Sequence, residues 1–364
     1  MPDRVLLTIG TKKGLFVAQA PGSRGTFTLR GPFGRGVDVY ASLIDTRAKK
    51  PRIYASSCNP FFGMKILRSN DLGKTFEETK SFPAFPKEDG RALKNIWSLE
   101  PGSDEQDLWC GVEPASLFRS RDGGDSWEMV PGISNHEHAR KWQPGAGGLC
   151  LHTILPDGER IHLGISTGGH YLSEDGGRTF APSNKGIGVG FAPEPLPEWG
   201  QCVHKIARPK DAPGRLYLQN HGGFPDRPGI GVVRSDDHGR TWRSIAKGLP
   251  SDFGFPILVH PHEPDTVFVL PLEPMTRTCP GGSPAVWRSE NGGGSWKKLA
   301  GGFPQKDSFF TVLRDSMAID EIKSPALYFG TTTGQLWVGR EGGEKWSCLF
   351  ESLPPIHNVK VAVV

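Results

Sequence analysis

Short runs of alternating hydrophobic and polar residues, separated by turn residues, follow one another along most of the chain. Residues 203–207, 215–219, 231–234 and 242–246 form one such group. Alternation with a period of two predicts β-strands, and the Gly, Pro and Asp residues between the runs predict tight turns. Groups of this kind predict small sheets of four strands at 37–80, 93–130, 148–182, 202–246, 255–299 and 309–350.

A sequence motif recurs between the last two strands of each predicted sheet. It reads Ser-x-Asp-x-Gly-x-(Ser/Thr)-(Trp/Phe), and its third positions are spaced 50 to 62 residues apart. An internal repeat of this length is typical of an array of similar structural units. The copies are 69–76, 120–127, 173–180, 235–242 and 289–296, with a degenerate copy at 339–346.

The chemistry of the motif predicts a hairpin turn. An Asp side chain accepts hydrogen bonds from backbone N–H groups a few residues further on and so fixes the turn. The glycine takes a positive φ without a steric clash, and the aromatic residue begins the return strand with a large apolar face to bury. Each copy is therefore expected to join the third and fourth strands of one sheet.

These motifs resemble the Asp-box (BNR) repeats of sialidases, sortilin-type receptors and bacterial exo-sialidase-like proteins. The resemblance extends over residues 37–350 through the repeated motifs. It implies a β-propeller, in which each repeat lies on one blade. It implies little about function, since in that family the Asp boxes lie away from the catalytic centre.

The two ends of the chain complete the blade count. Residues 5–9, 14–17 and 26–29 read as three strands with no strand before them, and 358–364 read as a strand with no sheet of its own. Placing the last strand beside the first three closes the array and removes two exposed sheet edges. We therefore predict an all-β fold, a seven-bladed β-propeller forming a single domain over residues 1–364, with the C-terminal strand closing the first blade.

Composition and charge limit the kinds of partner that the protein is expected to bind. The net charge is only +4, and no long run of Lys and Arg occurs, so no nucleic-acid partner is expected. Residues 1–10 lack the pattern of a signal peptide, and no apolar run is long enough to cross a membrane. We expect a cytoplasmic protein with its six cysteines as thiols, and the sequence leaves the oligomeric state open.

Histidines head two of the predicted innermost strands. Aligning these strands places Trp97, His152, His204, Phe255 and Phe310 in equivalent positions, expected to face the channel of the propeller. Cys150 and Cys202 precede the two histidines by two residues and so share their side of the strand. With His221 from the loop after the next strand, this set suits a divalent transition metal such as Zn, Cu, Fe or Ni.

The main hypothesis is a metal-assisted hydrolase or lyase that acts on a small polar substrate. His152, His204 and His221 would bind the metal, Glu113 or Glu273 would act as general base, and Trp97, Phe255, Phe310 and Arg314 would bind substrate. Two alternatives to a metal site remain open for these residues: they form a polar pocket that binds no metal, or they only line the channel. A structural ion pair remains an alternative for Arg314 and Asp315.

Two other functions remain open. A glycoside hydrolase needs a carboxylate pair, for which Asp38, Glu113, Glu273 and Asp315 are candidates. A non-catalytic propeller would use the same mouth to bind a peptide, glycan or protein. A true sialidase is not expected, because the Arg-Ile-Pro motif is absent and the tyrosines lie mainly in predicted core strands.

Overall fold

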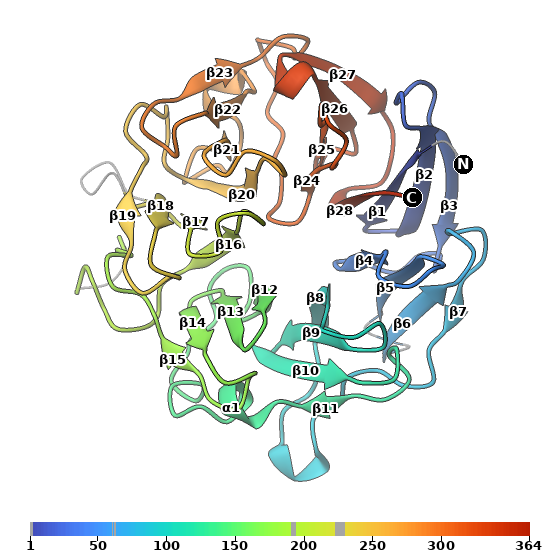
Figure 1. Ribbon diagram of the computed structural model, residues 1–364, viewed down its shortest axis with the longest axis vertical. Coiled ribbons are helices and arrows are strands. Elements are labelled where there is room, and N and C mark those ends of the chain that lie inside the picture. Colours follow the sequence, from blue (N-terminus) through green and yellow to red (C-terminus); the bar gives the residue numbers. More distant parts are fainter. Residues whose placement is uncertain (1–2, 60, 62, 191–193, 223–229) are drawn as a thin grey trace. The chain divides into compact units, whose positions relative to one another are not determined.

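The fold consists of seven four-stranded antiparallel sheets, each of which we call a blade, and it is that of a seven-bladed β-propeller (Figure 1). This computed structural model describes residues 3–59, 61, 63–190, 194–222 and 230–364. The predicted fold class is confirmed. In every blade but the first, the four strands are consecutive in sequence and adjacent in the sheet, because short turns join antiparallel neighbours.

The strands are numbered in chain order. Blades one to four comprise β28 (Ile356–Val363), β1 (Arg4–Thr11), β2 (Gly14–Pro21) and β3 (Thr28–Phe33); β4 (Ser42–Asp45), β5 (Arg52–Asn59), β6 (Gly63–Ser69) and β7 (Glu77–Glu78); β8 (Asn95–Pro101), β9 (Leu108–Glu113), β10 (Ser116–Ser120) and β11 (Glu128–Met129); and β12 (Leu151–Asp157), β13 (Arg160–Ile165), β14 (Gly169–Ser173) and β15 (Ala181–Pro182). Blades five to seven comprise β16 (Val203–Ala207), β17 (Leu216–Asn220), β18 (Val232–Ser235) and β19 (Arg243–Ser244); β20 (Gly254–Val259), β21 (Val267–Pro271), β22 (Val286–Ser289) and β23 (Lys297–Leu299); and β24 (Met317–Ile319), β25 (Leu327–Gly330), β26 (Leu336–Arg340) and β27 (Lys345–Phe350). The short helices are α1 (Pro131–Ser134) and the 3-10 turns η1 (Lys87–Asp89), η2 (Pro280–Gly282) and η3 (Glu341–Gly343).

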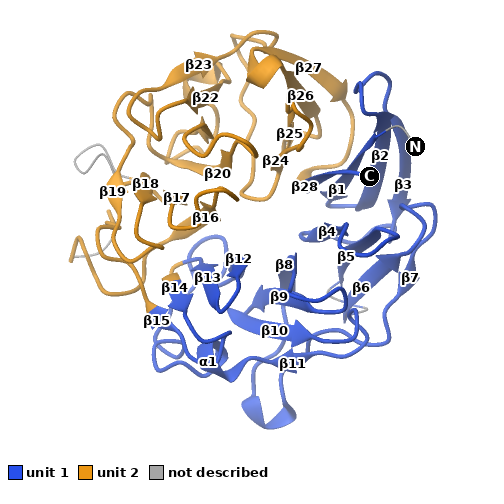
Figure 2. Ribbon diagram, viewed as in Figure 1, with its two compact units in different colours: residues 1–166, 171–181, 357–364 blue, residues 167–170, 182–356 orange. Residues whose placement is uncertain are grey.

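Contacts within the chain group it into two compact units (Figure 2). Unit one comprises residues 1–166, 171–181 and 357–364, and unit two comprises residues 167–170 and 182–356. Each site described below lies within one unit.

The first blade is closed by the last strand, as predicted. β28 lies beside β1 at one edge of this sheet, so the sheet order is β28-β1-β2-β3. Val359 of β28 is fully buried, and the amide oxygen of Asn358 accepts a hydrogen bond from the Ser42 hydroxyl of blade two. The C-terminal strand therefore belongs to the core of unit one.

The repeated motifs form the expected turns. In the third blade, Asp122 Oδ1 accepts hydrogen bonds from Ser120 Oγ (2.9 Å) and the Ser126 N–H (2.8 Å), and Oδ2 accepts from Ser126 Oγ (2.6 Å). The glycine two places after the aspartate, Gly124, has φ +91°. The same three hydrogen bonds form in three other copies, around Asp71, Asp175 and Asp237.

The outermost strands are shorter or displaced relative to the sequence prediction. β19 contains only Arg243 and Ser244 of the predicted 242–246, and β3 begins at Thr28 rather than residue 26. Trp242 is 6% exposed, and its indole N–H donates to the carbonyl oxygen of Ser183. The ring is therefore buried and tied to the segment that follows β15, and β19 begins one residue later.

A β-bulge interrupts the first strand of several blades. In β8 and β16, the pairing register skips Trp97 and His204, which are therefore extra residues between paired neighbours. β12 skips His152 in the same way, and β20 has an irregularity that spans Phe255. A bulge redirects the side chain of its extra residue. Trp97, His152 and His204 thus occupy equivalent bulged positions, for a reason that the alignment did not contain. The alignment was wrong for Phe310, which precedes β24 and lies outside the first strand of blade seven.

Candidate functional site

A pocket of about 490 Å³ lies in unit one, where the first strands of blades two and three begin. Its lining combines two carboxylates, two aromatic rings and a lysine. The lining residues are Asp38, Tyr40, Cys58, Met64, Lys94, Asn95, Trp97, Glu113, Ala146, Gly147 and Gly148. Three of them, Asp38, Trp97 and Glu113, are candidates from the sequence, and the structure brings them together.

Strand geometry places the two carboxylates. Asp38 and Cys58 exchange both backbone hydrogen bonds, at 3.2 and 2.9 Å, so Asp38 is held beside the end of β5. Glu113 is the last residue of β9 and lies opposite Asn95 of β8. Both side chains therefore project from backbone that is fixed by hydrogen bonds to a neighbouring strand.

Glu113 is held by its neighbours. Its Oε2 accepts a hydrogen bond of 3.0 Å from the indole N–H of Trp97. Gly148, with φ +88°, lies against the carboxylate so closely that a Cβ there would come within 2.6 Å of Oε1. A side chain at position 148 would therefore displace the carboxylate of Glu113.

Tyr40 lies between two aromatic rings. Its ring is stacked on His357 with a centroid distance of 4.4 Å, and it contacts Trp97 at 4.8 Å. Burial, and then the charges of Asp38, Cys58 and Glu113, raise the pKa of Tyr40 to about 12. Both carboxylates and this phenol line the same pocket.

His357 lies next to both Tyr40 and Asp38. Its Nε2 lies 3.8 Å from Asp38 Oδ1, and its side chain is 11% exposed. Burial lowers the pKa of His357, although the charge of Asp38 opposes this shift. Neither His357 nor Tyr40 was among the site residues predicted from the sequence. The spacing of Asp38 and Tyr40 could have predicted that Tyr40 lines the same pocket, because residues two apart share one side of an extended segment.

A second cluster lies in unit two, where β16 begins and β17 ends. The ligand atoms of Cys202, His204 and His221 all lie within 4.8 Å of one another. Burial, and then the charge of Arg314, lower the pKa of His204 well below its usual value. Burial and the charge of Arg277 also lower the pKa of His221. The sequence predicted two of the three members as metal ligands.

The third predicted ligand lies elsewhere. His152 belongs to unit one, is fully buried, and its Nδ1 lies 3.0 Å from Thr153 Oγ1. It is not a member of the Cys202 group. The third member of the group is Cys202, which was predicted only to share the side of the strand on which His204 lies.

The other predicted site residues have different surroundings. Phe255 and Phe310 are 7% and 5% exposed and pack in a hydrophobic cluster of unit two, so neither ring offers a free face to a substrate. This corrects the prediction that they bind substrate. Glu273 is exposed and is not in the pocket lining, and Asp315 forms an ion pair with Lys205 (2.5 Å).

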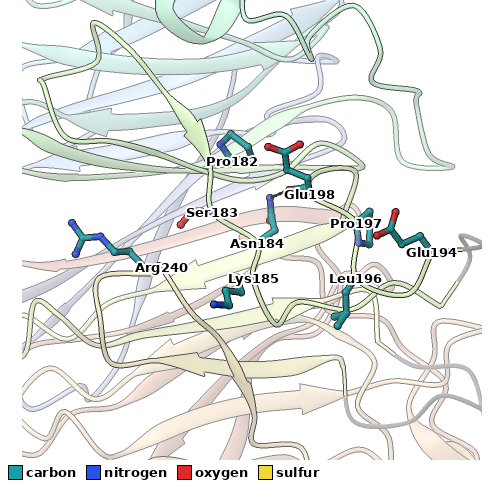
Figure 3. Close-up of a pocket in the computed structure, with 9 residues that line it drawn as sticks. All are labelled: Pro182, Ser183, Asn184, Lys185, Glu194, Leu196, Pro197, Glu198 and Arg240. Carbon is teal, nitrogen blue, oxygen red and sulfur yellow. Dashed lines mark hydrogen bonds between the residues drawn. The ribbon is translucent and has the colours of Figure 1, made fainter.

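A further hollow of about 440 Å³ in unit two was not anticipated from the sequence (Figure 3). It is lined by loop residues 182–185, 194 and 196–198, with Arg240. The Asn184 amide donates to the carbonyl oxygens of Glu198 and His170, at 3.0 and 3.1 Å. Asn184 therefore holds this loop together.

Membrane crossing by a helix is not supported: in the part of the chain that is described, no helix has the length and apolar character of a membrane span.

No protein-family model matches the chain. Among curated proteins, it is similar to a xyloglucanase of Paenibacillus sp., with 25% identity over 293 residues, which cover 73% of this chain and 26% of that protein. It is also similar to a probable oligoxyloglucan-reducing end-specific xyloglucanase of Neosartorya fischeri, with 26% identity over 276 residues, 68% of this chain and 31% of that protein. The chain therefore spans about a third or less of these relatives.

Among solved structures, the fold is similar to that of a GH74 xyloglucanase from Xanthomonas campestris, with a TM-score of 0.61 and 19% identity. The match covers 98% of this chain and 52% of that one. Among the functions predicted from the sequence, these relatives favour the glycoside hydrolase and give no support to the metal-assisted hydrolase.

Proposed function

We propose that the pocket of unit one binds a carbohydrate chain and that the protein is a glycoside hydrolase, with Asp38 and Glu113 as its carboxylate pair. The observation that carries this proposal is the presence of both carboxylates and two aromatic rings in one pocket of about 490 Å³. Glycoside hydrolysis by the common mechanisms needs two carboxyl groups on either side of the scissile bond.

The surroundings of the two carboxylates suggest which catalytic role each one has. Glu113 Oε2 accepts from an indole N–H, which can only donate, so this oxygen is oriented as a carboxylate oxygen. Glu113 suits the part of nucleophile or general base. Asp38, beside the stacked pair of Tyr40 and His357, would then protonate the leaving oxygen.

The aromatic rings suit a sugar substrate. Tyr40 and Trp97 are only partly buried, so each exposes some apolar area in the pocket. Rings with an apolar body and a polar edge are well suited to bind a ligand that has both kinds of surface. Lys94 and Asn95 add hydrogen-bond donors.

The similarity to xyloglucanases points to a polysaccharide or oligosaccharide rather than the small polar molecule expected from the sequence. We propose a β-glucan backbone as the substrate class. The non-catalytic alternative, in which the same pocket only binds a glycan, uses the same residues and is separated from hydrolysis by experiment.

The test combines binding and turnover. Xyloglucan oligosaccharides are titrated into the protein by calorimetry, and reducing ends are measured over time for the wild type, Asp38→Asn and Glu113→Gln. We expect binding in all three proteins and a loss of turnover of at least about a hundredfold in the two variants.

Glu100→Gln is the matched control. Glu100 lies on the same strand as Trp97, but its carboxylate pairs with Lys360 at 3.0 Å and is not part of the pocket lining. Its removal should leave turnover unchanged. Binding without turnover would replace the hydrolase by a glycan-binding protein, and absence of both binding and turnover would overturn the proposal.

A further inference from the structure

The group of Cys202, His204 and His221 in unit two has the composition of a metal site. Its three ligand atoms lie within 4.8 Å of one another, and Cys202 Sγ lies 3.7 Å from His204 Nε2. Zinc binds thiolate sulfur at about 2.3 Å and imidazole nitrogen at about 2.0 to 2.1 Å, so tetrahedral ligands lie about 3.5 Å apart. The sulfur and this nitrogen are close to that separation.

The pairing of β16 with β17 explains why these three residues meet here. Cys202 and His204 are two residues apart, and His221 follows β17 directly. The His221 N–H donates to the carbonyl oxygen of Cys202 at 2.9 Å, next to the paired residues Val203 and Asn220. His204 is the extra residue of the bulge in β16. The cluster is thus fixed by backbone contacts rather than by the side chains alone.

A backbone carbonyl orients His204 for metal binding. Its Nδ1 lies 2.6 Å from the carbonyl oxygen of Gly254, which can only accept, so Nδ1 carries the proton and donates. Nε2 is then the atom with a lone pair, and it is the one that faces Cys202. Metal-binding histidines typically donate their other ring N–H in this way.

The aromatic surroundings shield the site on one side. His204 is 2% exposed, and Phe253 and Phe255 pack against its ring with centroid distances of 5.5 and 4.7 Å. Phe253 also contacts the ring of His221 at 5.1 Å. Cys202 and His221 are partly exposed, so an ion has a route to the ligand atoms.

We propose that Cys202, His204 and His221 bind one zinc ion, with a fourth position open to a further ligand. One thiolate and two imidazoles form a set that suits zinc, and three protein ligands with an open position are typical of zinc sites that bind a water or substrate.

This proposal does not depend on the glycoside hydrolase proposal. The two rest on different residues in different units, and each can fail alone.

The test uses the full chain, stripped with a chelator, with any affinity tag removed, and loaded with zinc and then with cobalt(II). We expect one equivalent of zinc by elemental analysis after dialysis. In the cobalt form we expect an absorption band from thiolate-to-cobalt charge transfer. Cys202→Ser should abolish this band, and Cys202→Ser and His221→Gln should each weaken zinc binding at least tenfold.

Cys279→Ser and His260→Gln serve as matched controls in the same unit, since neither residue is in the group. Both should bind zinc as the wild type does, and circular dichroism checks that all variants are folded. Less than a tenth of an equivalent of zinc, a cobalt form without the thiolate band, or equal affinity in Cys202→Ser and the wild type would each overturn the proposal. Retention of copper(I) but not zinc would reject zinc as the ion.

Discussion

The indole N–H of Trp97 donates a hydrogen bond of 3.0 Å to Oε2 of Glu113 across the first two strands of blade three. Trp97 is in position to do so because the bulge in β8 falls at this residue, where the pairing register shifts between Ile96 and Ser98. The same ring contacts Tyr40 at 4.8 Å. One side chain therefore both positions a carboxylate and forms part of the wall that would contact a sugar.

Replacing Trp97 by Phe should separate these two roles. The variant keeps an aromatic ring but loses the N–H donor, so Glu113 is no longer fixed. We expect kcat on xyloglucan oligosaccharides to fall about tenfold, equivalent to roughly 1.4 kcal/mol, with KM changed less than about threefold. Trp97→Ala should also raise KM. Equal kcat values for Trp97→Phe and the wild type would show that the hydrogen bond has no part in turnover.

The ionisation of Tyr40 should report on the two carboxylates. Burial first, and then the charges of Asp38 and Glu113 among others, raise its pKa to about 12. NMR titration of ring-labelled tyrosine should show one signal that titrates near pH 12 and disappears in Tyr40→Phe. In Asp38→Asn the pKa of Tyr40 should be lower, because one negative charge is gone.

The same shift has a consequence for stability. The folded protein holds the Tyr40 proton more tightly than the unfolded chain, so its contribution is complete below pH 10 and declines as the pH rises toward 12. Tyr40→Phe should therefore lose less stability than the wild type between these pH values, as measured by urea denaturation. Parallel loss in both proteins would contradict the assignment.

The repeated turns should depend on the aspartate as an acceptor. Asp122→Ala removes three hydrogen bonds and should destabilise the protein by about 1 to 3 kcal/mol, measured by urea denaturation. Asp122→Asn should cost less, because Asn291 occupies this position in blade six, where its Nδ2 donates to Ser295 Oγ at 3.0 Å. If the two variants lost equal stability, the hydrogen-bond explanation would be wrong.

This turn also predicts a pH dependence. Although burial alone would raise the pKa of Asp122, hydrogen bonds from Ser126 and Ser120 lower it. A lowered pKa in the folded state means that the contribution is present above the unfolded value of 3.8 and is lost as the pH falls below it. Asp122→Asn should therefore show a smaller loss of stability in acid than the wild type.

The ion pair between Lys205 and Asp315 should be sensitive to removal of one partner. Their charged atoms lie 2.5 Å apart, and their side chains are 15% and 8% exposed. Asp315→Asn leaves a mostly buried lysine without its counter-charge and should destabilise the fold by about 3 kcal/mol. The double variant Lys205→Met, Asp315→Leu should recover much of this loss. A cost below about 0.5 kcal/mol for Asp315→Asn would place the pair among ordinary surface ion pairs.

The blades could be predicted from the sequence because each repeat contains both the alternating pattern of the strands and the turn motif that joins two of them. Asp122 and Gly124 show this: a side-chain acceptor and a residue with positive φ at fixed spacing determine a turn locally. The residue between them also takes a positive φ, even where it is Leu72 or His238, at +59° each. Glycine takes this position in four of the six copies, at residues 123, 176, 292 and 342, whereas in the other two copies the turn imposes a positive φ on a residue type that does not predict it.

The candidate site was predicted only in part, because it depends on contacts between blades. Asp38, Trp97 and Glu113 were candidates, but their meeting in one pocket depends on the register of neighbouring strands and on a bulge that alternation does not reveal. The aromatic character of Phe255 and Phe310 suggested a binding surface, whereas packing placed both rings in the core. Burial of this kind is decided by neighbours distant in sequence.

The closing strand has a consequence for how the protein is made. The fourth strand of the sheet that contains β1, β2 and β3 is β28, whose residues 356–363 are translated more than three hundred residues after β3. Until then β1 has an unpaired edge, which can attract other chains. During synthesis, the edge of β1 therefore stays open to other chains until β28 has been made.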